Sequence, residues 1–189
     1  ISDIVDLSKM DTNHLTLSYE ICNLNKLITK LQEQFNLNNK DRTQNIIVNN
    51  GLSDENSFII TDQTRLEQIL SNLIENAVKY APNGNVKVGY KKEGQTLVFY
   101  VKDEGSGIEK KDHKSIFGRF QQVENEYSGT ITSTGLGLSI VKELTELMKG
   151  EVWVESKEGS GATFYFTIPY QKANRRMSYI DSKTIKIKV

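Results

Sequence analysis

Residues 65–84, with the sequence RLEQILSNLIENAVKYAPNG, decide the fold of this chain. At about 100° of rotation per residue, the apolar side chains of this stretch form one stripe along a helix. The stripe consists of Leu66, Ile69, Leu70, Leu73 and Ala77. Asn72, Asn76 and Lys79 fall within about 60° of one another beside it. The helix is therefore expected to anchor in a core by one face and to carry two amides and an ammonium next to that face.

The row of asparagines is unusual for a helix surface. Asn has poor helix propensity, and a solvated face more often carries Glu and Lys. Neutral oxygen ligands beside a cation suit a magnesium ion that bridges phosphates, because magnesium prefers oxygen and keeps some of its waters. From this pattern alone a second interpretation stays open, in which the polar residues only border the core.

Three further motifs follow along the chain. A strand-like run at residues 96–102 leads into DEGSGI at residues 103–108, IFGRF occupies residues 116–120, and STGLGL at residues 133–138 opens a helix. In order and spacing, the Asn-rich helix and these motifs resemble the N, G1, F and G2 boxes of the ATP-binding domain of sensor histidine kinases. The resemblance covers roughly residues 15–170.

The resemblance implies an activity and partners. The chain would be the catalytic domain of a two-component sensor histidine kinase, hybrid kinases included, that binds ATP with Mg2+ and donates the γ-phosphate to a histidine on a dimerisation hairpin. Its partners would be that hairpin, absent from this chain, and the receiver domain of a response regulator downstream, within a homodimeric protein. The domain would be cytoplasmic, whether or not the whole protein is anchored in a membrane.

Composition argues against several other classes. The 24 Lys and Arg residues are balanced by 24 Asp and Glu, so no overall field points to nucleic acid or to an anionic membrane. No apolar run approaches the roughly 20 residues of a membrane span. The lone cysteine, Cys22, cannot form an internal disulfide, which fits a reducing compartment. The start at Ile1 suggests a fragment of a longer protein.

Local patterns predict an α+β fold, a two-layer sandwich with a mixed, largely antiparallel sheet under three main helices. Strands are expected at residues 15–21, 46–48 and 58–60, and hairpins at residues 86–101 and 152–168. Besides the Asn-rich helix, which Asp62 should cap, helices are expected from Leu24 to about Phe35, capped by Asn23, and from Gly135 to Met148.

Three regions divide the chain. Residues 1–14 are interpreted as the end of the second dimerisation helix and a junction, residues 15–170 as the ATP-binding domain, and residues 171–189 as a basic tail or linker. Within the domain, residues 104–134 show little periodicity and exceed an ordinary connection in length. We interpret them as a mobile lid over ATP, with a disordered segment as the alternative.

Asp103 is the first candidate for nucleotide recognition. It follows the parity of Leu97, Phe99 and Val101, so its carboxylate should point to the covered face of the sheet. A buried carboxylate needs hydrogen bonds, and the resemblance implies that this one accepts a bond from the adenine amine. The alternative is an aspartate that only caps the next turn.

The resemblance places further residues around the base. Gly105 and Gly107 would let the backbone turn tightly and approach a flat base, with Ile108 beside them. Tyr80 would stack on the adenine, the alternative being a plain core residue.

A phosphate site is expected where a loop becomes a helix. Unpaired amides and the helix dipole favour phosphate there, and glycine permits close approach. A Rossmann motif does not fit, because GxGxxG is incomplete and a polar segment precedes it. Ser133 stands where the family usually has glycine, a departure that bears on lid geometry rather than on nucleotide binding. The expected phosphate-site residues are Thr134, Gly135, Leu136, Gly137 and Leu138.

Asn72 separates two classes of enzyme. Relatives that hydrolyse ATP, such as gyrase and mismatch-repair ATPases, carry a glutamate four residues before the metal-binding Asn, where this chain has Asn72 before Asn76. An amide cannot take a proton from water, and phosphoryl transfer needs positioning and charge neutralisation more than a protein base. The prediction is a kinase in which Asn76 binds Mg2+, Asn72 assists through the metal's water shell, and Lys79 faces the phosphates.

The remaining candidates are less specific. Phe117 and Phe120 would anchor the lid, and Arg119 between them is a weaker candidate for contact with the γ-phosphate. The sequence contains no H box, and His14 and His113 are predicted to be ordinary surface histidines. The phosphoacceptor histidine is therefore expected outside this chain.

Two other functions stay open. A serine kinase of the anti-sigma type shares the fold, although the helical pattern at residues 1–10 argues against it. A non-catalytic nucleotide-sensing module would bind partners only, and the complete set of Asn, Asp and Gly residues argues against that reading.

Overall fold

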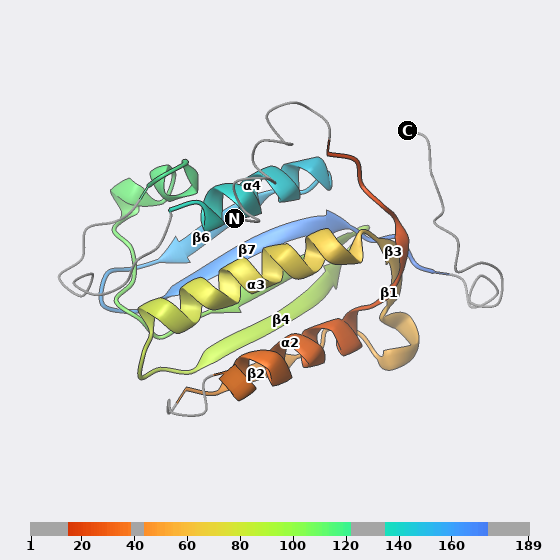
Figure 1. The fold of residues 1–189 in the computed structure, drawn as a ribbon, viewed down its shortest axis with the longest axis horizontal. Coiled ribbons are helices and arrows are strands. Elements are labelled where there is room, and N and C mark those ends of the chain that lie inside the picture. Colours follow the sequence, from red (N-terminus) through yellow and green to blue (C-terminus); the bar gives the residue numbers. More distant parts are fainter. Residues whose placement is uncertain (1–14, 39–43, 122–134, 174–189) are drawn as a thin grey trace.

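The computed structural model describes residues 15–38, 44–121 and 135–173 (Figure 1). The helix and junction predicted in residues 1–14, Ser133 and Thr134, and all but the first residues of the basic tail lie outside the described residues. The predicted limits of the three regions, with a lid at residues 104–134, stay predictions.

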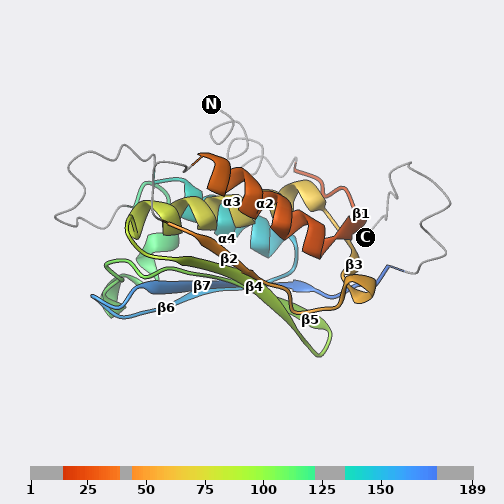
Figure 2. The ribbon, with the colours of Figure 1, turned by 90° about the horizontal axis from the view of Figure 1, so that it is seen from below.

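Three helices lie over one face of a five-stranded sheet, as Figure 2 shows. The helices are α2 (Leu24–Asn38), α3 (Gln63–Tyr80) and α4 (Gly137–Leu147). The strand order is β2 (Ile46–Asn49), β4 (Val86–Glu93), β5 (Thr96–Lys102), β7 (Ala162–Pro169) and β6 (Val152–Ser156). Only the β2–β4 pair is parallel, and the other three pairs in this sheet are antiparallel. The predicted α+β sandwich with a largely antiparallel sheet is confirmed.

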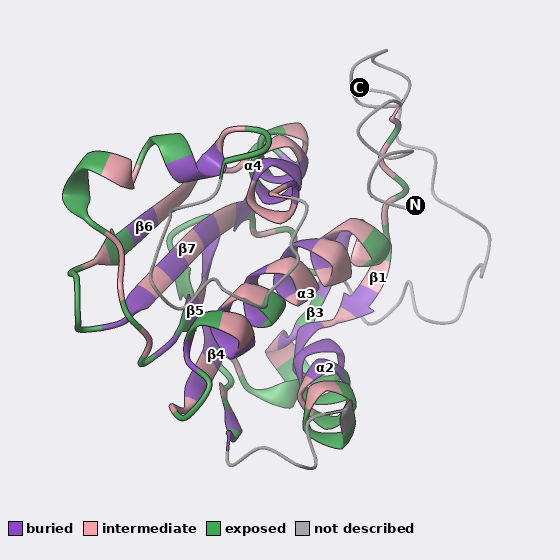
Figure 3. Ribbon diagram, turned by 60° about the vertical axis from the view of Figure 1, so that its left-hand side comes forward, coloured by how far each residue is buried: buried purple, intermediate pink, exposed green. Residues whose placement is uncertain are grey.

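The core lies between the sheet and the helices. Burial alternates along β7 (Figure 3), with Phe164, Phe166 and Ile168 on the covered face. The rings of Phe99 and Phe166 stack across β5 and β7 with centroids 4.7 Å apart. The apolar stripe of α3 packs against this layer and is buried from Leu66 onward. The predicted core face of the Asn-rich helix is therefore correct.

The open face of the sheet carries one row of residues in register across all five strands. The row runs Trp153, Tyr165, Tyr100, Gly89 and Asn49. A side chain at Gly89 would begin 2.6 Å from the Tyr100 hydroxyl, so the glycine leaves room for that ring. The hydroxyl accepts a hydrogen bond from Asn49 Nδ2 at 3.0 Å. The missing side chain thus explains a glycine within a strand.

A second, small sheet joins segments that are far apart in the sequence. β1 (Glu20–Asn23) pairs antiparallel with β3 (Phe58–Thr61), and β3 also bonds residues 171–173 on its other side. The prediction of a strand over residues 15–21 is wrong in its limits, because its partner β3 has only four residues. Pairing stops at Glu20 opposite Thr61, where the chain turns into α3.

Helix caps follow the expectations closely. Asn23 Oδ1 accepts from Lys26 N at 3.0 Å and Asp62 Oδ1 accepts from Arg65 N at 3.0 Å. Both predicted caps are correct, although α2 continues three residues beyond Phe35. α4 begins at Gly137 and not at Gly135, because Gly135 has a left-handed φ of 67° that a helix does not allow.

Candidate functional site

The polar row of α3 borders a pocket. Asn72, Asn76 and Lys79 are all partly buried, next to the fully buried stripe of the same helix. Asn76 lines the pocket, whereas Asn72 faces the start of α4, where a side chain built on Gly137 would lie 3.9 Å from its amide. Burial does not separate the two asparagines, since both are partly buried.

The pocket lies between α3, the end of β5, β7 and the start of α4. It holds about 580 Å³ of empty space, counting the part open to solvent. It is lined by Asn76, Tyr80, Asp103, Ser106, Gly107, Ile108, Ile116, Gln121, Leu138, Ala162 and Phe164. Most of these side chains are apolar or aromatic, and Asp103 is the one carboxylate among the described residues that line it.

Asp103 follows the last residue of β5 and is only 4% exposed. Its Oδ1 atom accepts hydrogen bonds from Gly105 N at 2.9 Å and from Ala162 N at 3.2 Å. Burial raises the pKa of the carboxyl, and the two backbone hydrogen bonds offset part of that rise. The predicted orientation toward the covered face is correct, and the carboxylate is also the acceptor that closes the following turn.

Gly105 and Gly107 approach protein backbone. A Cβ on Gly105 would lie 2.3 Å from the Tyr80 carbonyl oxygen, and one on Gly107 would lie 2.1 Å from the Lys157 carbonyl oxygen. Gly107 also has a φ of 71°. Packing of the DEGSGI turn against α3 and the β6–β7 turn therefore explains both glycines, where we expected close approach to a base. Gly107 and Ile108 line the pocket.

Tyr80 and Lys79 end α3 at the rim of the pocket. Tyr80 is 41% exposed and lines the pocket, so it is not a core residue. Lys79 Nζ lies 3.1 Å from the Tyr80 hydroxyl and 4.6 Å from the centre of its ring. Lys79 thus packs on the tyrosine at the edge of the pocket rather than lining it.

The segment after the DEGSGI turn is folded as far as the structure describes it. Two short 3-10 helices, η2 (Lys110–Asp112) and η3 (Ser115–Phe117), occupy a region in which we expected little structure. Phe117 is buried and meets Phe164 edge to face, with centroids 6.2 Å apart. The anchoring predicted for Phe117 agrees with this. Phe120 does not anchor the segment, because its side chain is 74% exposed.

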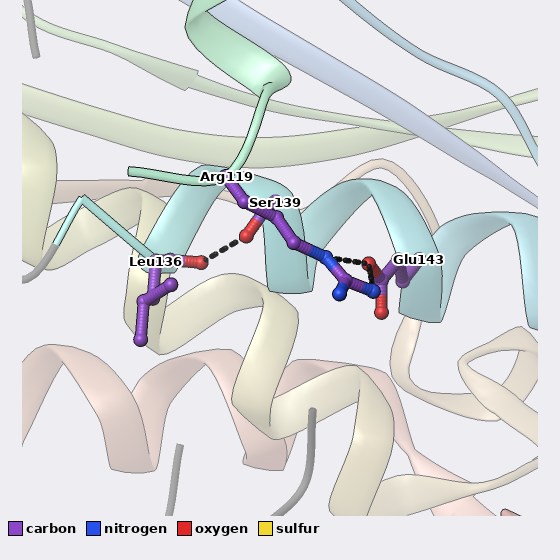
Figure 4. Close-up of polar contacts among 4 residues, drawn as sticks. All are labelled: Arg119, Leu136, Ser139 and Glu143. Atoms are coloured by element: carbon purple, nitrogen blue, oxygen red, sulfur yellow. Dashed lines mark hydrogen bonds and ion pairs between the residues drawn. The ribbon is translucent and has the colours of Figure 1, made fainter. Parts of the chain in front are cut away.

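The loop-to-helix turn at α4 lies beside the IFGRF segment. Phe120 N donates to the Gly135 carbonyl at 3.1 Å. Leu136 is buried, and its carbonyl accepts from the Ser139 hydroxyl at 2.8 Å (Figure 4). Leu138 lines the pocket next to this turn. The first amides of α4 therefore lie close to the pocket, whereas the phosphate site predicted there stays a prediction and Thr134 lies outside the described residues.

Arg119 pairs with Glu143 of α4. Its Nη2 and Nε lie 2.8 Å and 3.1 Å from Glu143 Oε1. The guanidinium is thus held on α4, and Arg119 is not among the residues that line the pocket.

Some residues that line the pocket were not predicted from the sequence. Ala162 and Phe164 share the parity of Phe166 and Ile168, a signal that could have placed them on the same face as Asp103. Gln121 carries no such signal, because only packing of the IFGRF segment brings it to the pocket.

Neither His113 nor Cys22, which the sequence did not assign to the site, lines the pocket. His113 Nε2 lies 3.1 Å from the Ile108 carbonyl and is partly buried. Cys22 is a free, buried thiol whose pKa burial raises to about 12. Neither has the surroundings of a nucleophile.

The side chains of Asn72 and Asn76 fit a magnesium ion only if phosphates supply further ligands to it. In the described ranges no three His, Cys, Asp or Glu side chains gather to hold a metal. Asn72 Nδ2 is buried without a hydrogen-bond partner in that part of the chain, and amide oxygen and nitrogen positions can be exchanged. An unpaired amide beside Asn76 fits a phosphate-bound magnesium with its water shell, because such an ion needs few protein ligands.

Sequence comparison identifies similar proteins. A model of the family described as "Histidine kinase-, DNA gyrase B-, and HSP90-like ATPase" matches residues 61–172. The chain is 33% identical over 175 residues to the sensor histidine kinase WalK of Bacillus subtilis (strain 168), a match that covers 91% of this chain and 28% of that protein. The chain therefore spans less than a third of the length of this curated relative.

Structure comparison gives two informative neighbours. Full-length ShkA in complex with AMPPNP superposes with a TM-score of 0.79 and 28% identity, over 90% of this chain and 35% of that one. The nucleotide-free catalytic domain of the histidine kinase ThkA superposes with a TM-score of 0.70 and 27% identity, over 82% of this chain and 97% of that one. Across the described residues, no helix combines the length and hydropathy needed to cross a bilayer.

Proposed function

Because the chain belongs to the family of histidine kinase-, DNA gyrase B- and HSP90-like ATPases, we propose that it presents the γ-phosphate of ATP to a histidine on a dimerisation hairpin. The match confirms the ATP-binding catalytic role expected from the four motifs. The observation that carries the proposal is the buried Asp103 carboxylate, which lines the pocket with both backbone hydrogen bonds on Oδ1.

Asp103 is proposed to select adenine. With Oδ1 engaged by the protein, Oδ2 is the oxygen that can accept from the exocyclic amine of the base. Tyr80, exposed at the rim, supplies a flat ring for stacking. Gly107 and Ile108 complete the pocket walls on the side of the DEGSGI turn. A buried acceptor that needs a donor discriminates strongly against a base that lacks one.

The phosphates are proposed to lie between α3 and the start of α4. Asn76 and Asn72 would hold the magnesium ion and its water shell, and Lys79 would turn from Tyr80 toward the phosphates. Gly137 and Leu138 offer first-turn amides of α4, which have no partner within the helix. A bound magnesium ion would neutralise phosphate charge.

Transfer to a protein nucleophile is favoured over hydrolysis. Asn72 stands near the start of α4, and an amide cannot serve as a base toward water. Among the described residues that line the pocket, Asp103 carries the one carboxylate. Its hydrogen-bond partners are backbone amides, at the end of the pocket proposed to bind adenine. The acceptor hairpin, the downstream receiver domain, dimerisation of the whole protein and a cytoplasmic location belong to the same proposal.

The test uses this chain with radioactive ATP. Alone it should bind ATP, release phosphate barely above background and not label itself. Mixed with a separate dimerisation hairpin that carries an H-box histidine, it should label that hairpin weakly, because the covalent link that raises the local concentration is missing. The label should be acid-labile and base-stable, as phosphohistidine is.

The alternatives predict other outcomes. Rapid phosphate release by the chain alone would assign it to the ATPases, and stable labelling of a serine would favour a serine kinase of the anti-sigma type. ATP binding without any transfer to hairpins would favour a nucleotide-sensing module.

A further inference from the structure

Arg119 and Glu143 join two segments that flank the pocket. Figure 4 shows the guanidinium of Arg119 lying along α4 and pointing to the carboxylate of Glu143. Nε and Nη2 of Arg119 donate to Oε1 of Glu143 at 3.1 Å and 2.8 Å. The ion pair is only partly exposed, at 40% for the Arg119 side chain and 25% for that of Glu143.

A backbone hydrogen bond closes the same junction one residue away. Phe120 N donates to the Gly135 carbonyl at 3.1 Å, and a Cβ on Gly135 would lie 3.0 Å from the Phe120 backbone. We call the Arg119–Glu143 ion pair and the Phe120–Gly135 hydrogen bond together the clasp. Phe120 and Gly135 both have left-handed φ values, 59° and 67°.

The clasp sits between two walls of the pocket. Ile116 and Gln121 line the pocket from the segment that carries Arg119, and Leu138 lines it from the helix that carries Glu143. η3 and α4 are in direct contact. The relative placement of these walls, and of the first amides of α4, therefore depends on what holds Arg119 to Glu143.

Glu143 needs its partner. Its Oε2 atom is buried and has no hydrogen-bond partner within the described part of the chain. A carboxylate with a buried oxygen is costly unless a cation compensates its charge. The negative charge of Glu143 therefore holds the Arg119 side chain on α4.

We propose that Arg119 is a positioning residue for the triphosphate, acting through Glu143, and does not itself contact the phosphates. This inference rests on the proposed ATP site. By holding the IFGRF segment on α4, the clasp sets the distance between the pocket wall and the amides that open the helix. The carboxylate of Asp103 is held by Gly105 and Ala162 and not by the clasp, so adenine recognition should not depend on the clasp.

The test compares ATP and adenosine binding by titration calorimetry in Arg119→Gln, Glu143→Gln and the double variant. Each single change should weaken ATP by about threefold, the effect of a partly exposed ion pair. The double variant should be no weaker than either single variant, because both remove the same interaction. Adenosine affinity should stay as in the native chain. Lys30→Gln, which removes the Lys30–Glu67 ion pair between α2 and α3, is the matched control and should leave both affinities unchanged.

Glu143→Gln decides between positioning and direct contact. If Arg119 were a phosphate ligand, removing the charge of Glu143 would release it, so ATP affinity would stay or rise while Arg119→Gln alone weakened it. That outcome overturns the inference, as does an equal loss for adenosine. If the native chain fails to bind ATP at all, the proposed function itself is wrong, and the two failures are thereby distinguished.

Discussion

Asp103 Oδ1 lies 2.9 Å from Gly105 N and accepts its hydrogen bond, which closes the turn at the end of β5. The same oxygen also accepts from Ala162 N on β7. One oxygen of the carboxylate thus holds two elements of the protein together, and the other is the atom that can meet a ligand in the pocket.

Asp103→Asn should abolish the preference for ATP. The side-chain amide of this variant has two orientations, and in each its NH2 group faces another donor. In one orientation it faces the backbone amides of Gly105 and Ala162, and in the other it faces the adenine amine. We expect ATP affinity to fall by at least about tenfold, measured by titration calorimetry. GTP should bind poorly to the native chain, because guanine presents a carbonyl where adenine has its amine. Equal native affinities for ATP and GTP would remove Asp103 from this role.

The same carboxyl should make the stability of the ligand-free protein depend on pH. Burial raises its folded-state pKa above the usual 3.8, so in the interval between the two values the folded chain holds a proton that the unfolded chain has lost. The free energy of unfolding therefore falls as pH rises through that interval and is level above it.

Asp103→Asn removes this contribution. The difference in unfolding free energy, variant minus native, should grow as pH rises above the ordinary carboxyl pKa of 3.8 and level off once pH exceeds the raised pKa of the folded state, in urea titrations at a series of pH values. A difference that shrinks over the same range would mean that the folded protein lowers this pKa.

Asn76→Ala should remove the part of ATP affinity that depends on magnesium. Asn76 lines the pocket and Asn72 does not, so Asn72→Ala should have the smaller effect. The measurement is ATP affinity with and without magnesium in both variants. Asn50→Ala, at an exposed position after β2, is the control. An unchanged magnesium dependence in Asn76→Ala would show the assignment to be wrong.

Asp62 should contribute to stability through two separate contacts. Its Oδ1 caps α3 at Arg65 N, and its Oδ2 accepts from Ser18 N at 2.8 Å. Asp62→Ala loses both and should lower the unfolding free energy by about 2 kcal/mol. Asp62→Ser can still cap the helix and should cost about half as much. Identical losses in the two variants would mean that the cap adds nothing, and an unchanged stability of Asp62→Ser would mean that the Ser18 contact adds nothing.

Several features of the site follow directly from local sequence patterns. The α3 stripe, both side-chain caps and the two hairpins agree with their predicted positions, because hydrophobic period and cap chemistry act over a few residues. The parity of β5 also placed Asp103 on the covered face. The boundaries were less accurate, since β1 begins at Glu20, opposite the last residue of its partner β3, and not where its own alternation begins.

By itself, the sequence determined the two-layer α+β class, the polar row on α3 and the four motifs that indicate an ATP site. Only the tertiary structure decided that Gly105 packs on the Tyr80 carbonyl, that Phe117 but not Phe120 is buried, and that Arg119 pairs with Glu143. Periodicity reports which face of one element is apolar, and it is local. Contacts between segments dozens of residues apart depend on how those elements pack in three dimensions, which no local pattern encodes.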